Sequence, residues 1–234
     1  MIGVLHADDE LVAVDKPAGI AMHRSSMAAR EDAYLVDAIR EQLGRTLYLA
    51  HRLDRATSGV VLLAASKETA AALGAQFMSR AVEKVYLAVA RGVVDEAGTI
   101  DHPLDAPGQR EAKRAVTHYR RLASIELPIA LGRYDTVRYS LVEARPETGR
   151  YRQIRRHFKH LSHHLIGDTS HGEGRHNRLF RMNWSVHRLL LHAWKIRLAH
   201  PVTGAPLEIV APLDASWEKL LRAFGWSLQS AVPC

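Results

Sequence analysis

The residues best suited to chemistry lie at positions 51–59, whose sequence is HRLDRATSG. Asp54 stands between Arg52 and Arg55, and a strongly apolar run follows at 60–65. A carboxylate beside cations stays ionised at neutral pH, because opposite charge favours its charged form. A loop at the mouth of a buried strand is a rigid place to hold such a group. The charge pattern leaves two interpretations open: a catalytic carboxylate, or a solvated Arg-Asp-Arg cluster at the end of a strand.

The elements that must position this loop follow from hydrophobic periodicity. Apolar runs at 4–6 and 11–15 flank an acidic turn and predict a hairpin. Helices are predicted at 34–43, ended by Gly44, and at 67–80, 151–161 and 214–223. Strands are predicted at 60–65, 83–90, 117–123, 136–144, 188–199 and 206–210, and residues 166–180 are predicted to be a glycine-rich connection.

The order of these elements indicates the fold class. Strands and helices do not alternate strictly, and no repeat or linker interrupts the chain. We therefore predict an α+β fold, with a mixed, largely antiparallel sheet flanked by helices, in one domain over residues 1–234.

Strand 83–90 carries a second candidate for chemistry. Its period of two places Tyr86 on one face with Ala88 and Ala90. Small neighbours leave room for a ligand to lie against the tyrosine ring. The alternative is an ordinary core tyrosine.

Composition limits the class of protein. The chain has 234 residues, 47% of them apolar, and a formal net charge of +7. A basic protein of this kind favours an acidic partner such as nucleic acid. The sole cysteine, Cys234, permits no internal disulfide, and the chain shows neither a signal peptide nor an apolar run long enough to span a membrane. We therefore expect a cytoplasmic protein that does not bind membranes.

A group of histidines offers a competing function. His157, His160 and His164 recur at i, i+3 and i+7, a spacing that suits a metal-dependent hydrolase. Neither a cysteine nor an HExxH pattern accompanies them. We expect no metal site here, and interpret the segment as part of a basic surface that faces RNA.

Four segments, in order, resemble the RluA-type pseudouridine synthases. HRLDRATSG at 51–59 matches the active-site signature HRLDxxTSG of that family. DKPAG at 15–19 resembles its KPxG segment, and EKVYLAVARG at 83–92 resembles the strand that carries its active-site tyrosine. TGRYRQIR at 148–155 resembles TGRxHQIR, with Arg152 where the family usually has His. Some relatives carry an N-terminal RNA-binding domain, which we do not expect here because the catalytic pattern starts at residue 4.

The resemblance implies a reaction and three catalytic residues. Members of the family convert uridine in RNA to pseudouridine, an isomerisation that conserves atoms and so requires no cofactor or metal. Asp54 would be the catalytic carboxylate, whether as a nucleophile or as a base at the sugar. Arg155 would pair with Asp54, and Tyr86 would stack on the uracil. Arg52 would take part in displacing the target nucleotide.

A finer resemblance concerns the RNA target. Residues 166–180 and 22–25 are similar to the TruC subgroup, whose members modify uridine 65 of tRNA. We expect a monomer without a protein partner that acts on tRNA. The alternatives are a synthase acting on ribosomal RNA and an RNA-binding module without catalysis. The residues predicted to contact RNA are Arg52, Arg150, Arg156, Lys159, Arg175 and Arg178.

Overall fold

A computed structural model describes residues 1–23, 34–108 and 111–228. The chain divides into two compact units. Unit 1 comprises Met1–Lys84 and His192–Pro212, and unit 2 comprises Val85–Leu191 and Leu213–Cys234. Arg24 and Ser25 of the segment at 22–25, and the lone Cys234, lie outside the described residues.

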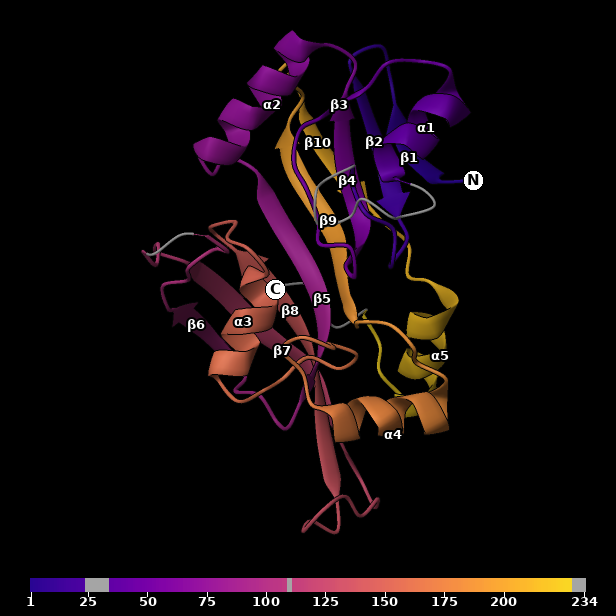
Figure 1. Ribbon diagram of the computed structural model, residues 1–234, viewed down its shortest axis with the longest axis vertical. Helices are drawn as coiled ribbons and strands as arrows, with labels where there is room; N and C mark the ends of the chain where they lie inside the picture. Colours follow the sequence, from indigo (N-terminus) through magenta and orange to yellow (C-terminus); the bar gives the residue numbers. More distant parts are fainter. Residues whose placement is uncertain (24–33, 109–110, 229–234) are drawn as a thin grey trace. The chain divides into compact units, whose positions relative to one another are not determined.

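Unit 1 is built on a mixed sheet (Figure 1). Its strands are β1 (Gly3–Ala7), β2 (Leu11–Lys16), β3 (Tyr48–Leu49), β4 (Ser58–Ala64), β9 (Leu191–Ala199) and β10 (Pro206–Val210). Strand β4 pairs antiparallel with β2 and β3, and parallel with β9. Strands β1 and β10 add antiparallel partners to β2 and β9. The predicted hairpin is confirmed.

Two helices belong to this sheet. Helix α1 (Leu35–Leu43) ends at Gly44, whose φ of 64° suits glycine. Helix α2 (Lys67–Met78) begins at Ser66, whose side chain accepts from the Thr69 N–H. Leu73 of α2 packs into a buried cluster with apolar residues from β2, β4, β9 and β10. Both helices confirm the predicted ones, with α2 ending two residues earlier than expected.

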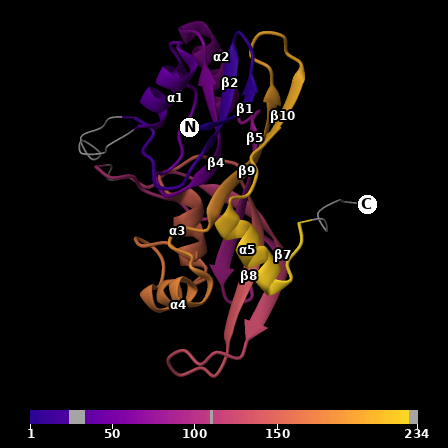
Figure 2. The ribbon, with the colours of Figure 1, turned by 90° about the vertical axis from the view of Figure 1, so that its right-hand side faces the viewer.

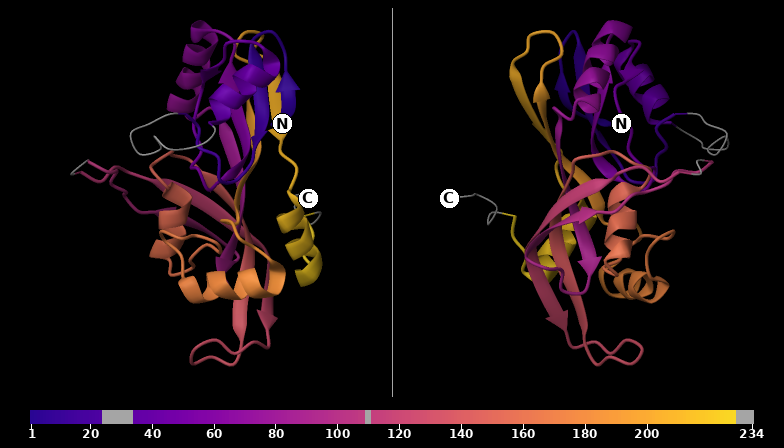
Figure 3. Two further views of the ribbon diagram at one scale, coloured as in Figure 1. Left: turned by 45° about the vertical axis from the view of Figure 1, so that its right-hand side comes forward. Right: turned by 90° about the vertical axis from the view of Figure 1, so that its left-hand side faces the viewer.

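Unit 2 holds an antiparallel sheet in the order β5-β8-β7-β6 (Figure 2). Its strands are β5 (Glu83–Arg91), β6 (Ala97–Asp101), β7 (Val116–Leu127) and β8 (Val137–Pro146). Strands β7 and β8 are longer than predicted, and their connecting loop extends beyond helix α4 in every view (Figure 3). Strand β6 was not predicted, because Ile100 is its one buried apolar residue.

Three helices complete unit 2: α3 (Gln153–His160), α4 (Gly174–Trp184) and α5 (Ala215–Phe224). The prediction of a loop over all of 166–180 is wrong, since α4 begins at Gly174. Its apolar side, Phe180 and Trp184, packs with Phe224 of α5 and Tyr139 of β8. A helix with so few apolar residues acquires its stability from that tertiary contact, which local periodicity does not reveal.

The predicted α+β class with largely antiparallel pairing is confirmed. None of the described helices has the length and apolar character needed to cross a membrane.

Candidate active site

In unit 1, a buried lysine ties down the loop that carries Asp54. Lys16 is fully buried at the end of β2. Its ammonium donates to the carbonyl oxygens of Pro17 and Arg55 at 3.0 Å and of Thr57 at 2.8 Å. The Gly19 N–H also donates to Arg55 O at 2.8 Å, and the Arg55 side chain returns a bond to Gly19 O at 2.9 Å. The segments predicted from DKPAG and HRLDRATSG therefore form one bonded structure around half-buried Asp54.

The end of this loop requires a glycine. Gly59 has a φ of 109°, and a Cβ there would lie 2.2 Å from Ala193 O in β9. Next to it, Ser58 Oγ and His192 Nδ1 share a buried hydrogen bond of 2.7 Å. Close backbone approach at Gly59 and this bond fix the parallel junction of β4 and β9, from which the loop emerges.

His51, the first residue of the signature, serves the same scaffold. Its Nε2 accepts from the Leu62 N–H at 3.0 Å, and its ring lies 4.8 Å from that of Phe77. Burial, with a smaller contribution from Lys84, lowers the pKa of His51 to about 4. The imidazole is therefore neutral at physiological pH and acts as an acceptor rather than as a charge.

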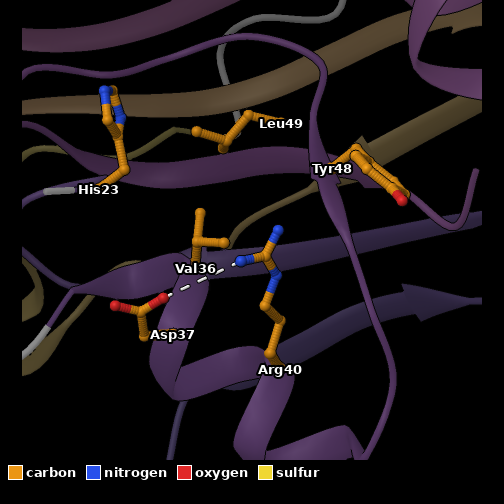
Figure 4. Close-up of a pocket in the computed structure, with 6 residues that line it drawn as sticks. All are labelled: His23, Val36, Asp37, Arg40, Tyr48 and Leu49. Carbon is orange, nitrogen blue, oxygen red and sulfur yellow. Dashed lines mark ion pairs between the residues drawn. The ribbon is translucent and has the colours of Figure 1, made fainter. Parts of the chain in front are cut away.

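A hollow of about 540 Å³ lies beside α1 and β3 in unit 1. Figure 4 shows its lining residues: His23, Val36, Asp37, Arg40, Tyr48 and Leu49. The Arg40 side chain lies in it and donates from Nε to Leu47 O at 3.0 Å. None of the predicted site residues lines this hollow, so we assign it no role in the reaction.

In unit 2, Arg155 is held by a residue to which the sequence assigned no role. Its Nε and Nη2 donate to Oδ2 and Oδ1 of Asp168, both at 2.7 Å. Arg155 is 4% exposed and Asp168 is 2% exposed. A two-point ion pair fixes the plane of a guanidinium group in a way that a lysine cannot reproduce.

The segment after α3 is shaped to hold Asp168. Burial opposes ionisation of its carboxyl, but bonds from Arg155 and from the His171 and Ser170 N–H groups lower its pKa. Asn177 of α4 donates to Asp168 O and accepts from the Gly167 N–H, both at 2.8 Å. The Asp168 carboxylate therefore stays charged in a rigid turn.

Two further motif residues lie at the start of α3. Gln153 accepts from Thr148 Oγ1 at 2.7 Å and from the Arg150 N–H at 2.9 Å, and donates to Val116 O at 2.9 Å. Arg152, at the usual histidine position, adopts a left-handed φ of 51° and precedes the first helical turn. Helix α3 therefore begins at Gln153, two residues later than predicted.

The histidines are used as structural groups. His157 is fully buried, and its ring nitrogens bond to Thr117 Oγ1 at 2.9 Å and His102 O at 3.0 Å. His160 stacks on His102, and His164 bonds to His171 O at 2.7 Å. Over the part of the chain that the structure describes, no three His, Cys, Asp or Glu side chains gather in a way that would hold a metal ion. Both ring nitrogens of His157 take part in these hydrogen bonds, so neither is left to bind the metal ion of the hydrolase alternative.

Tyr86 lies on β5, half-buried, with Ala144 of β8 directly opposite. Ala88 follows it on the same face, as alternation predicted. The ring is therefore bordered by small side chains within unit 2.

The predicted RNA-binding residues are distributed over surface positions. Arg52 is exposed in the Asp54 loop of unit 1. In unit 2, Lys159 and Arg178 are exposed on α3 and α4, whereas Arg156 forms an ion pair with Asp105 and Arg150 donates to Arg114 O at 3.0 Å. Arg175 is exposed at the start of α4.

The structure brings some predicted site residues together with partners that the sequence reasoning missed. Lys16 and Gln153 lie in motifs that the sequence analysis recognised, and Asp168 lies in the segment 166–180. The sequence therefore pointed to each residue, but it did not predict the hydrogen bonds that each one forms. Asp54 belongs to unit 1 whereas Arg155 and Tyr86 belong to unit 2, and the expected contacts among them stay predictions.

These features define a class of protein. The profile of the RNA pseudouridylate synthase family matches residues 10–160, which include Asp54, Tyr86 and Arg155. The chain belongs to this family, and the enzyme class predicted from its motifs is confirmed.

Several known proteins are similar to this chain over most of its length. A tRNA pseudouridine synthase C of Pectobacterium carotovorum subsp. carotovorum is 46% identical over 97% of this chain, which spans 63% of that relative's length. A protein of the same name from Vibrio cholerae serotype O1 is 45% identical, over 97% of both chains. The solved structure of human RNA Pseudouridylate Synthase Domain Containing 4 has a TM-score of 0.74 at 25% identity, covering 95% of this chain and 93% of its own.

Proposed function

We propose that this chain isomerises uridine to pseudouridine in tRNA, at position 65, and that it acts as a monomer in the cytoplasm without a cofactor. The observation that carries the tRNA assignment is the 45% identity to a tRNA pseudouridine synthase C along 97% of both chains. Position 65 rests on the resemblance of residues 166–180 to the TruC subgroup. Several residues of that segment, Gly167, Asp168 and Asn177 among them, hold the turn beside Arg155.

Asp54 is the catalytic carboxylate in this proposal. The reaction breaks the N1–C1′ bond of the uridine, turns the base and forms a C5–C1′ bond. The C5 proton leaves and N1 gains a proton, so no oxidant or other co-reactant enters. One ionised carboxylate is sufficient, either to attack covalently or to take a proton from the sugar. The bonds from Lys16 to the loop support this role, because they keep the backbone around Asp54 in one conformation.

Arg155 and Tyr86 are the other two catalytic residues that we propose. Asp168 holds Nε and Nη2 of Arg155 and fixes the plane of its guanidinium group, and we assign Asp54 as a further acceptor for this group. In this proposal Tyr86 stacks on the uracil, and its hydroxyl group helps to move the C5 proton. The small side chains of Ala88 and Ala144 support this assignment.

The target uridine must leave its stack to reach a half-buried carboxylate, at a cost of a few kcal/mol. Arg52 fills the vacated space with its flat guanidinium group. Cationic side chains then hold phosphates of the substrate RNA. The residues assigned to this contact are Arg150, Arg156, Lys159, Arg175 and Arg178.

The experiment uses purified protein and three RNAs: transcribed tRNA with U65, the same tRNA with C65, and ribosomal RNA fragments. Pseudouridine mapped at position 65 of the first RNA alone is the expected result. Asp54→Asn should bind the tRNA and form no product, because it keeps the side-chain size and loses the charge. Pseudouridine in the ribosomal RNA fragments would overturn the assignment of tRNA as the substrate. Near wild-type turnover by Asp54→Asn would overturn the assignment of Asp54 as the catalytic carboxylate.

A further inference from the structure

The loop between β7 and β8 carries an exposed aromatic residue within a group of arginines. Residues 128–136 join the two strands and extend beyond α4 (Figure 3). Tyr134 near the end of this loop is 53% exposed. The loop is ordered by backbone bonds between Leu131 and Tyr134, with N···O distances of 2.9 and 3.4 Å. Gly132 between them has a φ of 67°, which a tight turn requires.

The tyrosine ring is held on one side. The guanidinium carbon of Arg133 lies 5.0 Å from the ring centroid, and Nη2 of Arg133 donates to the Tyr134 hydroxyl at 2.8 Å. An arginine that covers one side of a ring and bonds to its hydroxyl restrains the ring without burying it. With more than half of the residue exposed, the rest of the ring is open to a flat ligand.

Further cations lie around this ring. The bond from Arg133, together with the charges of Arg133, Arg91 and Arg138, lowers the pKa of the Tyr134 hydroxyl. Arg175 of α4 lies against the loop, since a Cβ built on Gly132 would be 2.8 Å from its Nη1. The loop and the start of α4 therefore form one patch of Arg133, Tyr134, Arg138 and Arg175, which we call the hairpin patch.

Three acidic side chains lie near the hairpin patch. Glu173 forms an ion pair with Arg91 and lies 3.4 Å from His176 Nε2, and Glu126 accepts from Thr136 at 2.6 Å. Asp135 is exposed on the loop itself. Arg91 and the three arginines of the patch outnumber these three acidic residues, so the positive charge is in excess next to the exposed aromatic ring. Arginine with an exposed aromatic ring suits a single-stranded or frayed nucleotide, because phosphates pair with the guanidinium groups and the base stacks on the ring.

The hairpin patch is far from the catalytic tyrosine of the same unit. Tyr86 pairs with Ala144, and β8 runs seven residues back from Ala144 to Val137 before the loop begins. At about 3.3 Å per residue this separation is roughly 23 Å. A ligand on Tyr134 is therefore not the uridine that reacts.

We propose that the hairpin patch is a second RNA-binding site, at which a nucleotide of the substrate remote from the target uridine stacks on Tyr134 while its phosphates contact Arg133, Arg138 and Arg175. This inference rests on the proposed function, since it takes the ligand to be part of the RNA substrate. A second RNA-binding site explains the length of the β7–β8 hairpin, because the reaction itself does not need a hairpin of that length.

The test measures binding and turnover separately. Tyr134→Ala should weaken the binding of full-length tRNA at least about fivefold, the loss expected for one stacked base. Tyr134→Phe should bind nearly as wild type, because it keeps the ring. At saturating tRNA, Tyr134→Ala should turn over at the wild-type rate. Arg133→Ala should also weaken binding, whereas Arg222→Ala, which removes an exposed arginine of α5, serves as the matched control for lost charge.

A short stem-loop that carries the target uridine but extends less than about 20 Å from it separates the two sites. Wild type and Tyr134→Ala should bind this RNA equally. Equal binding of full-length tRNA by both proteins would overturn the inference, and so would an equal loss of affinity for both RNAs. If wild type forms no pseudouridine but Tyr134→Ala still loses tRNA affinity, the proposed function fails and the RNA site stands.

Discussion

Arg155 and Asp168 form a buried two-point ion pair in unit 2, with both N···O distances at 2.7 Å. The pair joins α3 to the turn that precedes α4. Two N–H groups of that turn also donate to the Asp168 carboxylate, at 2.9 Å each. The turn therefore fixes the orientation of the Arg155 guanidinium group.

Breaking this pair should destabilise the protein. Asp168→Asn removes the carboxylate charge of a buried two-point ion pair, so we expect the free energy of unfolding to fall by about 3–5 kcal/mol. Denaturant titration at pH 7 measures this. Glu218→Gln, which breaks an exposed pair with Arg222, should leave the free energy nearly unchanged. Because the pKa of Asp168 is lowered in the fold, the difference between wild type and Asp168→Asn should shrink as the pH falls below about 3.9. A constant difference at all pH values would contradict the ion-pair account.

Lys16→Met should loosen the Asp54 loop. Methionine retains most of the buried volume of the side chain but removes the donor to three carbonyl oxygens. Arg55 O keeps its bond from the Gly19 N–H, whereas a buried acceptor left without a partner costs about 1–3 kcal/mol. We expect a lower melting temperature and a fall in turnover on tRNA at saturating substrate. Lys67→Met, at an exposed position at the start of α2, is the control, and an equal effect of both changes would refute this role for Lys16.

Alanine should have opposite effects at two glycines of unit 1. Gly59→Ala places a Cβ 2.2 Å from Ala193 O at a positive φ, so we expect a loss of more than about 2 kcal/mol in the free energy of unfolding. Gly74 lies inside α2, and a Cβ there meets nothing within 4 Å. Gly74→Ala should therefore stabilise the protein by up to about 1 kcal/mol. Thermal unfolding of the two variants checks the pair, and a stable Gly59→Ala would disprove the close contact.

Stability should depend on pH through His51. Its pKa is about 4 in the fold, below the usual value of 6.5. A group with a depressed pKa stabilises the fold above its unfolded pKa and loses that contribution as the pH falls through the folded value. The free energy of unfolding should therefore decrease between pH 6.5 and about 4. Buried His157 and half-buried His171 and His176, whose pKa values are also lowered, act in the same direction. His51→Gln should reduce the decrease, and an identical pH profile for that variant would contradict the assignment.

The salt dependence of tRNA binding should distinguish two arginines. Arg178 is exposed on α4, whereas Arg156 is already paired with Asp105. If both contact phosphates, Arg178→Ala should reduce the slope of log K against log salt by about one. Arg156→Ala should reduce it less, because Asp105 neutralises part of its charge. Binding by wild type that does not change with salt would show that phosphate contacts are unimportant.

The sequence by itself determined most of the elements and the chemistry-bearing residue types. The hairpin at 4–15, helix α1 with its Gly44 end and strand β10 follow from local patterns, because apolar periodicity and capping residues act over only a few positions. The four motifs identified the family through residues that stand close together in the chain. Helix α4 was not predicted, because its stability comes from Phe180 and Trp184, which pack on residues far away in the sequence.

Only the tertiary structure decided which charged groups meet. Arg155 lies thirteen positions from Asp168, and Lys16 lies forty-one from Thr57. No local periodicity encodes such contacts, since they depend on the path of the chain through strands and turns. Burial then gives each contact its importance, because a charge that leaves water must find a partner. For this reason Lys16 and Asp168, which the sequence presents as ordinary polar residues, support the loop of Asp54 and the orientation of Arg155.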